Sequence, residues 1–107
     1  MRYLKTYELL RGVDNEPKYL GKYYCVFLGK NVASDSEREV YRYRNINFSW
    51  DNAKSQFTLV DVWKSDISNH DTNSCAKKII NLGINFGDVK SKIDNFWMEK
   101  EMEKYNL

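Results

Sequence analysis

The sequence contains few of the residues that interrupt or cross-link a chain. Of its 107 residues, one is proline, five are glycine and two are cysteine. This scarcity, together with 42% hydrophobic residues, excludes a low-complexity chain and is typical of a globular protein. The chain is long enough to bury a core without metals or disulfides. We therefore predict that residues 1–107 form a single compact domain.

The sequence also lacks a long apolar run. The first residues carry charges at Arg2, Lys5 and Arg11, and no stretch is long enough for the core of a signal peptide or for a membrane span. We therefore expect a cytoplasmic protein that does not bind a membrane. Because reducing compartments disfavour disulfides, Cys25 and Cys75 are expected to be free, buried thiols.

Neither sign of charge dominates the sequence. The formal net charge is +2, from 17 basic and 15 acidic residues, which is low for a non-specific DNA binder and excludes an acidic mimic of nucleic acid. Asparagine, lysine and tyrosine are frequent, and their codons are AT-rich. This composition favours a low-GC bacterium, or a phage or plasmid of such a bacterium, as the source.

Catalytic patterns are missing as well. His70 is the only histidine and lies in the polar run SDISNHD, where the nearby carboxylates have no recognised metal-ligand spacing. The sequence has no nucleophile elbow, phosphate-binding glycine loop, CxxC or HExxH pattern. We expect no catalytic residue, no metal ligand and no cofactor, and we predict that the protein is not an enzyme.

What the sequence does have is a strand-like first part. Residues 18–29 are predicted to form a strand that is apolar on both faces and covered on both sides. Residues 38–50 and 57–64 are predicted to be two further strands, joined by the turn DNAKSQ, with Trp50 opposite Phe57. Residues 2–11 fit a strand or a helix, and we favour the strand.

In this register the phase of the large apolar residues changes between Tyr43 and Ile46. Either a β-bulge near Arg44 and Asn45 restores these groups to one side, or the sheet has a second, mixed face. Asp61 lies between valines in the last strand, so it is expected to pair with Arg42 or Arg44.

Helical spacing follows the strands. A short helix is predicted to begin at residue 72, 73 or 74 and to end near Leu82, and a second is predicted from residue 87 or 88 to Lys104. The inward stripe of the second helix is predicted to contain Val89, Ile93, Phe96 and Trp97. A second stripe, made of Met98, Met102 and Tyr105, either packs on the sheet edge or binds a partner. The predicted fold class is α+β: an antiparallel sheet of three to four strands followed by two C-terminal helices packed on one face.

If residues 2–11 are helical, the order α-β-β-β-α resembles the double-stranded-RNA-binding domain. Lys77 and Lys78 are similar to the lysine pair of that family. The loop GKNVASDSERE lacks the family's Gly-Pro-x-His pattern, and the C-terminal helix is additional. The resemblance therefore implies a topology and no functional residue.

An aromatic content of 15% predicts a binding surface. The predicted site residues are Tyr41, Tyr43, Arg42, Arg44, Lys64 and Tyr24. The leading hypothesis is a small non-enzymatic regulator or inhibitor that binds a host protein and is encoded by a phage or plasmid. The alternative is a nucleic-acid-binding module, in which the tyrosines stack on unpaired bases and the arginines hold phosphates. Homodimerisation through the same face is compatible with both hypotheses.

Overall fold

The structure is a computed structural model that describes residues 16–29, 36–63, 67 and 70–105. Within these residues the chain forms five strands and two helices. In chain order they are β1 (Lys18–Phe27), β2 (Ser36–Tyr43), β3 (Ile46–Asp51), β4 (Gln56–Val62), α2 (His70–Ala76), β5 (Asn81–Gly83) and α3 (Phe86–Tyr105). Residues 2–11, for which we favoured a strand, lie outside the described part of the chain.

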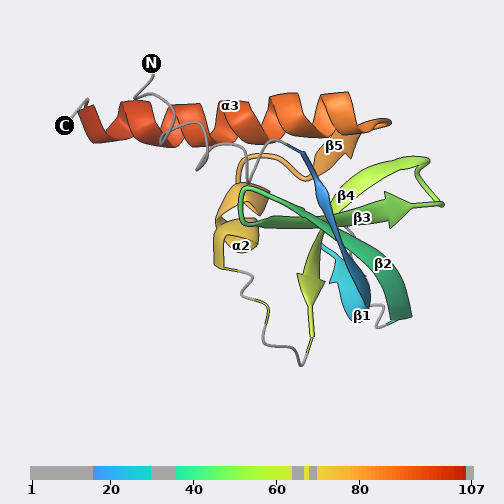
Figure 1. The fold of residues 1–107 in the computed structure, drawn as a ribbon. Coiled ribbons are helices and arrows are strands. Elements are labelled where there is room, and N and C mark those ends of the chain that lie inside the picture. Colours follow the sequence, from blue (N-terminus) through green and yellow to red (C-terminus); the bar gives the residue numbers. More distant parts are fainter. Residues whose placement is uncertain (1–15, 30–35, 64–66, 68–69, 106–107) are drawn as a thin grey trace, which may run out of the picture.

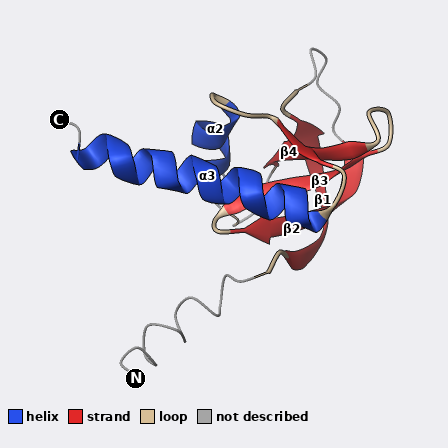
Figure 2. Cartoon of the chain, turned by 90° about the horizontal axis from the view of Figure 1, so that it is seen from above, coloured by secondary structure: helices blue, strands red, loops and turns tan. Residues whose placement is uncertain are grey.

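The strands form one antiparallel sheet in the order β1-β2-β3-β4-β5. The C-terminal end of β1 also pairs with β4, with Cys25 opposite Val62 and Phe27 opposite Val60, so the first four strands close into a small barrel. The helix α3 crosses this barrel, and its C-terminal half extends beyond the strands (Figure 1, Figure 2). The prediction of a mixed fold with an antiparallel sheet is confirmed. The sheet, however, has more strands than predicted and is closed, which also separates it from the topology of the double-stranded-RNA-binding domain.

Two hydrophobic cores lie on opposite faces of the sheet. The barrel interior contains Cys25, Phe27, Val40, Val60 and Val62. The second core lies between the outer face of the sheet, which points away from the barrel interior, and the two helices. Its buried members are Tyr43, Ile46, Phe48, Leu59, Cys75, Leu82, Val89, Ile93 and Phe96. Both cysteines are free and buried, as predicted.

The change of phase between Tyr43 and Ile46 has a cause that we did not predict. Arg44 and Asn45 have φ angles of 49° and 69°, and Tyr43 pairs with Ile46. Two central residues with positive φ are the mark of a type I′ hairpin turn. The predicted strand 38–50 is therefore wrong: it is two strands, β2 and β3, and a reversal of the chain replaces the predicted bulge. The predicted pairing of Trp50 with Phe57 is confirmed.

In the described residues after β4, the structure has one long helix instead of the two helices predicted. The first helix ends at Ala76, and residues 81–83 form β5, in which Gly83 pairs with Phe57. Leu82 is therefore buried as a strand residue rather than as the last residue of a helix. The second helix is confirmed, with Val89, Ile93 and Phe96 buried. Among the described residues, neither helix combines the length and apolarity needed to cross a membrane.

Candidate binding groove

Six aromatic rings form a continuous cluster on the outer face of the sheet, beside the N-terminal end of α3. The members are Tyr19, Tyr41, Phe48, Trp50, Phe57 and Phe86, and the centroids of contacting rings are 5.0–6.3 Å apart. Phe48 is fully buried at the base of the cluster, whereas Tyr19 is 50% exposed and Phe86 is 37% exposed. The cluster thus joins the second core to the protein surface.

A β-bulge in β1 places Tyr19 in this cluster. The register with β2 shifts between Tyr19 and Gly21, and Gly21 has a φ of 124°, a conformation that glycine adopts without strain. Because of this shift, Tyr19 lies opposite Tyr41 and Lys22 lies opposite Glu39. Paired residues point to the same side of a sheet, so Tyr19 and Lys22 both lie on the outer face. The prediction that β1 is covered on both sides is therefore wrong, because Tyr19, Lys22 and Tyr24 are exposed on its outer face.

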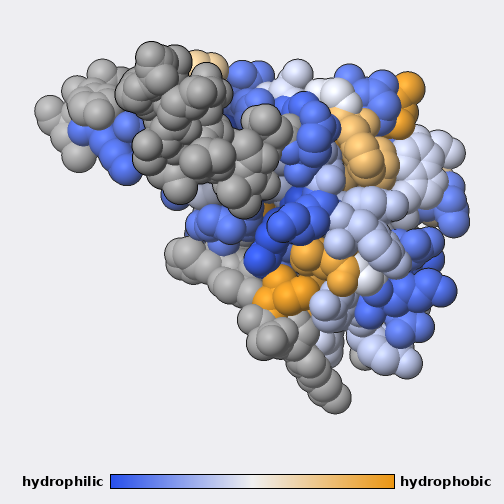
Figure 3. All heavy atoms as spheres, viewed as in Figure 1, coloured by the Kyte–Doolittle hydropathy of each residue, from blue (hydrophilic) through white to orange (hydrophobic). Residues whose placement is uncertain are grey.

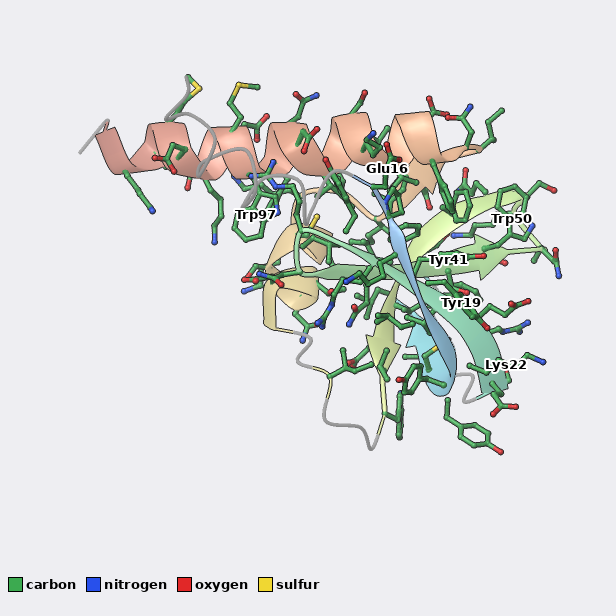
Figure 4. The ribbon with its side chains drawn as sticks, in the orientation of Figure 1. Glu16, Tyr19, Lys22, Tyr41, Trp50 and Trp97 are labelled. Atoms are coloured by element: carbon green, nitrogen blue, oxygen red, sulfur yellow. The ribbon has the colours of Figure 1, made fainter. Side chains whose placement is uncertain are left out.

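A hollow opens where β2 and β3 separate. The ladder between these strands ends at Val40 and Ser49; beyond this pair, β2 continues along β1 and β3 continues along β4. The hollow has a volume of about 450 Å³. Its lining residues are Lys22, Glu37, Arg38, Glu39, Tyr41, Ser49, Trp50, Asn52 and Phe57. We call this hollow the aromatic groove; Figure 4 shows Tyr41, Trp50 and Lys22 around it, with Tyr19 beside Tyr41.

The charges that line the aromatic groove are balanced. Two basic residues, Lys22 and Arg38, stand beside two acidic residues, Glu37 and Glu39. Partial desolvation, followed by a hydrogen bond with Glu39, raises the pKa of Tyr19 above its usual value. On this side of the molecule, residues of intermediate hydropathy lie among strongly hydrophilic ones (Figure 3). The groove is thus an apolar floor with a mixed polar rim.

The residues predicted for the site do not form one surface. Tyr41 lines the aromatic groove, whereas Tyr24 is 60% exposed farther along β1, opposite Glu37. Arg42 faces the other side of β2 and donates a hydrogen bond to Asn47 Oδ1 at 2.9 Å. Tyr43 is buried. Lys64 lies outside the described residues.

Tyr43 and Arg44 attach the β2–β3 hairpin to α3. The Tyr43 hydroxyl donates a hydrogen bond to Asp94 Oδ1 at 2.9 Å, and the Arg44 guanidinium forms an ion pair with the same atom at 2.8 Å. The Trp97 indole N–H donates to the carbonyl of Arg44 at 3.0 Å. We expected Asp61 to pair with Arg42 or Arg44. Arg44 instead pairs with Asp94. The predicted site residues Tyr43 and Arg44 therefore have a structural role in the fold.

Tyr43 is expected to make the free energy of unfolding fall as the pH rises above 10. Burial, and then the hydrogen bond to Asp94, raise the pKa of Tyr43 from 10.0 to about 12. This contribution to stability is fully present below pH 10 and is lost as the pH rises to about 12, because the unfolded chain ionises first. Urea titrations of the wild type and Tyr43→Phe at about pH 9 and about pH 11 test this, since one proton changes stability by at most about 1.4 kcal/mol per pH unit. An equal loss in both proteins would contradict it.

Of the residues that line the groove, only Tyr41 was among the predicted site residues. Trp50 and Phe57 were predicted to be paired core residues, and Glu37 and Glu39 were not singled out. A second hollow, of about 430 Å³, lies beside the C-terminal half of α3 and is lined by Trp97, Met98 and Met102, among others. Both methionines are about half exposed. Within the described residues no group of histidine, cysteine and carboxylate side chains could hold a metal ion.

Comparison with known proteins gave no family model, no curated protein and no solved structure that matches this chain.

Proposed function

We propose that the protein is a non-enzymatic binding protein that recognises a host protein through the aromatic groove and acts as its regulator or inhibitor by covering the bound surface. The observation that carries this proposal is the exposed rim of an otherwise packed aromatic cluster. Tyrosine and tryptophan at the centre of an interface contribute large contact areas at a small cost in conformational entropy. Polar residues around such a centre are typical of protein interfaces.

The support of the groove is consistent with this role. Phe48 is buried beneath Tyr41, and Phe57 is held between Trp50 and Phe86 with ring centroids 5.0 Å and 5.4 Å away. Rings that are already packed lose little further freedom when a partner binds. A rigid aromatic floor therefore favours a specific partner.

The charges favour a protein over a nucleic acid. A groove that follows a phosphate backbone is lined by an excess of basic residues, whereas this groove has as many carboxylates as basic groups. Arg42 lies on the opposite face of β2 from Tyr41, and Arg44 is paired with Asp94. The arrangement of alternating tyrosines and arginines on one face, on which the nucleic-acid hypothesis depended, is absent from the described strands.

We expect Trp50→Ala to remove the partner that the wild type retains in a pull-down. The bait is the tagged full-length chain, the source is a lysate of a low-GC bacterium, and each capture is run with and without nuclease. Loss of a central interface tryptophan is expected to weaken binding by at least about tenfold. Trp63→Ala is the matched control, because Trp63 is 40% exposed but lies beyond the end of β4, away from the groove.

The same captures separate the other hypotheses. Retention by Trp50→Ala together with loss by Tyr24→Ala would place the interface farther along β1 and overturn the groove. Recovery of nucleic acid alone, with every protein lost after nuclease treatment, would support the nucleic-acid alternative. Thermal melting of each variant checks that the variant is folded, so that a loss of binding is not a loss of folding.

A further inference from the structure

One edge of β2 is only half used by the sheet. Along its whole length β2 pairs with β1, from Ser36 opposite Cys25 to Arg42 opposite Lys18. On its other side, β2 pairs with β3 only from Val40 to Tyr43. No strand of the described chain therefore pairs with residues 36–39 of β2 on this side. The aromatic groove lies directly along this open edge.

The backbone groups of Glu37 and Glu39 point toward the groove. The Ser49 hydroxyl of β3 donates a hydrogen bond to the carbonyl of Glu39 at 2.7 Å, which shows that this carbonyl faces β3. In an antiparallel strand the N–H and C=O of one residue point to the same side, and alternate residues repeat the direction. The N–H and C=O of Glu37 therefore point into the groove as well. A strand edge of this kind is a template for another extended chain.

We infer that the partner enters the groove as an extended segment, which adds to the open edge of β2 as a further strand. The inference rests on the proposed function and specifies the form of the bound partner. The Glu39 carbonyl already accepts the hydrogen bond from Ser49, so main-chain hydrogen bonds to the N–H and C=O of Glu37 and to the N–H of Glu39 supply affinity. Side chains on alternate positions of the segment supply specificity. The segment lies along the open edge of β2, beyond the point where β3 has separated from it.

The residues on the outer face of the sheet determine which side chains a bound segment needs. Glu37 and Glu39 project to the same face as Tyr41, because they are four and two residues from it in the strand. Side chains of the segment on this face meet these carboxylates at one end and the rings of Tyr41, Trp50 and Phe57 at the other. The preferred segment therefore has a basic residue and a large apolar residue on alternate positions of one face.

A second copy of this chain fits the edge poorly. Two β2 edges paired antiparallel about a two-fold axis would bring the glutamates of one copy beside those of the other on the same face. Like charges directly opposite each other destabilise a strand pair. The charges thus favour a different, basic and apolar, segment over homodimerisation through β2.

The test uses the full-length chain and a displayed library of random peptides of about ten residues, a length that covers one strand. The tightest peptide is then synthesised with N-methyl groups on alternate backbone nitrogens, in one phase and in the other. Methylation of the nitrogens that face β2 is expected to weaken binding at least about tenfold, whereas methylation of those that face away changes it by less than about threefold.

A variant of the protein tests the same contact from the other side. Glu37→Pro removes the N–H that points into the groove and leaves the hydrogen bonds to β1, since proline is tolerated on a strand edge. We expect this variant to lose the peptide and Glu37→Ala, the matched control, to retain most of the affinity. The N-methylated peptides remain decisive should Glu37→Pro fail to fold.

The outcomes separate the inference from the proposed function. Peptides that lose binding to Trp50→Ala yet tolerate methylation in both phases would overturn the added strand and leave the groove as the interface. Peptides that bind Trp50→Ala as well as the wild type would overturn the groove itself. A library that yields no binder would overturn the inference. If the wild-type chain forms a dimer that the Glu37→Pro substitution dissociates, the occupant of the edge is a second copy of this chain, and the inference of a different partner is overturned.

Discussion

Replacing Gly83 with alanine is expected to destabilise the protein by about 2–4 kcal/mol. Gly83 pairs with Phe57 in β5 and has a φ of 107°, which strains any residue with a side chain. A Cβ atom at this position would collide with Cβ of Asp88 and would lie 2.7 Å from its Oδ2. Backbone strain and overpacking therefore act at the same residue.

The collision would also disturb the start of α3. Asp88 Oδ2 accepts a hydrogen bond from the N–H of Ile84, and the Asp88 N–H donates to Asn85 Oδ1 at 2.8 Å. The bond from Asp88 N–H to Asn85 Oδ1 caps the helix, and the bond from Ile84 N–H to Asp88 Oδ2 joins the first turn of α3 to the preceding residues. Phe86 lies in the first turn of α3, and its ring centroid is 5.3 Å from that of Tyr41. Phe86 therefore supports the floor of the aromatic groove. Gly83→Ala is therefore expected to weaken partner binding as well as stability.

Urea unfolding of Gly83→Ala and of the control Gly87→Ala measures the effect. Gly87 lies in the first turn of α3, where alanine is the better helix former, and its nearest contact would be Asn85 Oδ1 at 3.1 Å. The two effects oppose each other, so we expect Gly87→Ala to change the free energy of unfolding by less than about 1 kcal/mol. Equal losses of unfolding free energy in the two variants would show that the positive φ of Gly83 does not cause the destabilisation.

The parts of the fold that could be predicted depend on local periodicity. The pairing of Trp50 with Phe57 follows from the alternation of large apolar residues on both sides of a turn that begins with Asp51. The inward stripe of α3, with Val89 and Ile93, follows from helical spacing. Both patterns lie within a few residues of the contacts that they predict.

The features that were missed depend on contacts between distant residues. Arg44 and Asn45 do not form one of the common sequence signals for a type I′ turn, such as Asn-Gly. The turn is instead attached to α3 through Asp94 and Trp97, which lie fifty or more residues later in the sequence. In the same way, β5 is only three residues long and depends on its pairing with β4, so the sequence around Leu82 resembled a helix.

The aromatic groove could not be predicted for the same reason. It arises where β2 leaves β3, and this separation accompanies the closure of the barrel by β1 and β4. Tyr41 was identified from its type and its neighbours, but its partners Phe57 and Phe86 come from β4 and α3. The sequence therefore indicated the aromatic excess of a binding surface without its position, and the functional class stays a prediction.

Replacing Phe48 with alanine is expected to destabilise the protein by about 3–5 kcal/mol, more than Gly83→Ala. The Phe48 ring is fully buried, and its centroid lies 5.7 Å from that of Tyr41, 5.5 Å from Phe57 and 6.2 Å from Phe86. Removing the ring leaves a cavity beneath three rings at once. The loss of stability has two parts: the favourable free energy of burying the ring is lost, and the residues that line the cavity lose their contacts with the ring.

Phe48→Leu is the matched control, because leucine keeps an apolar side chain of similar reach and is expected to cost less than about 1.5 kcal/mol. Urea unfolding gives both values, and an unchanged m-value shows that the unfolded states are comparable. Since Phe48 has no exposed surface, it cannot touch a partner directly. A Phe48→Leu protein that stays folded but loses the partner would therefore show that binding depends on how Phe48 orients Tyr41 and Phe57. Full binding by this variant would mean that the rings at the rim keep their positions without the stacked contact below them.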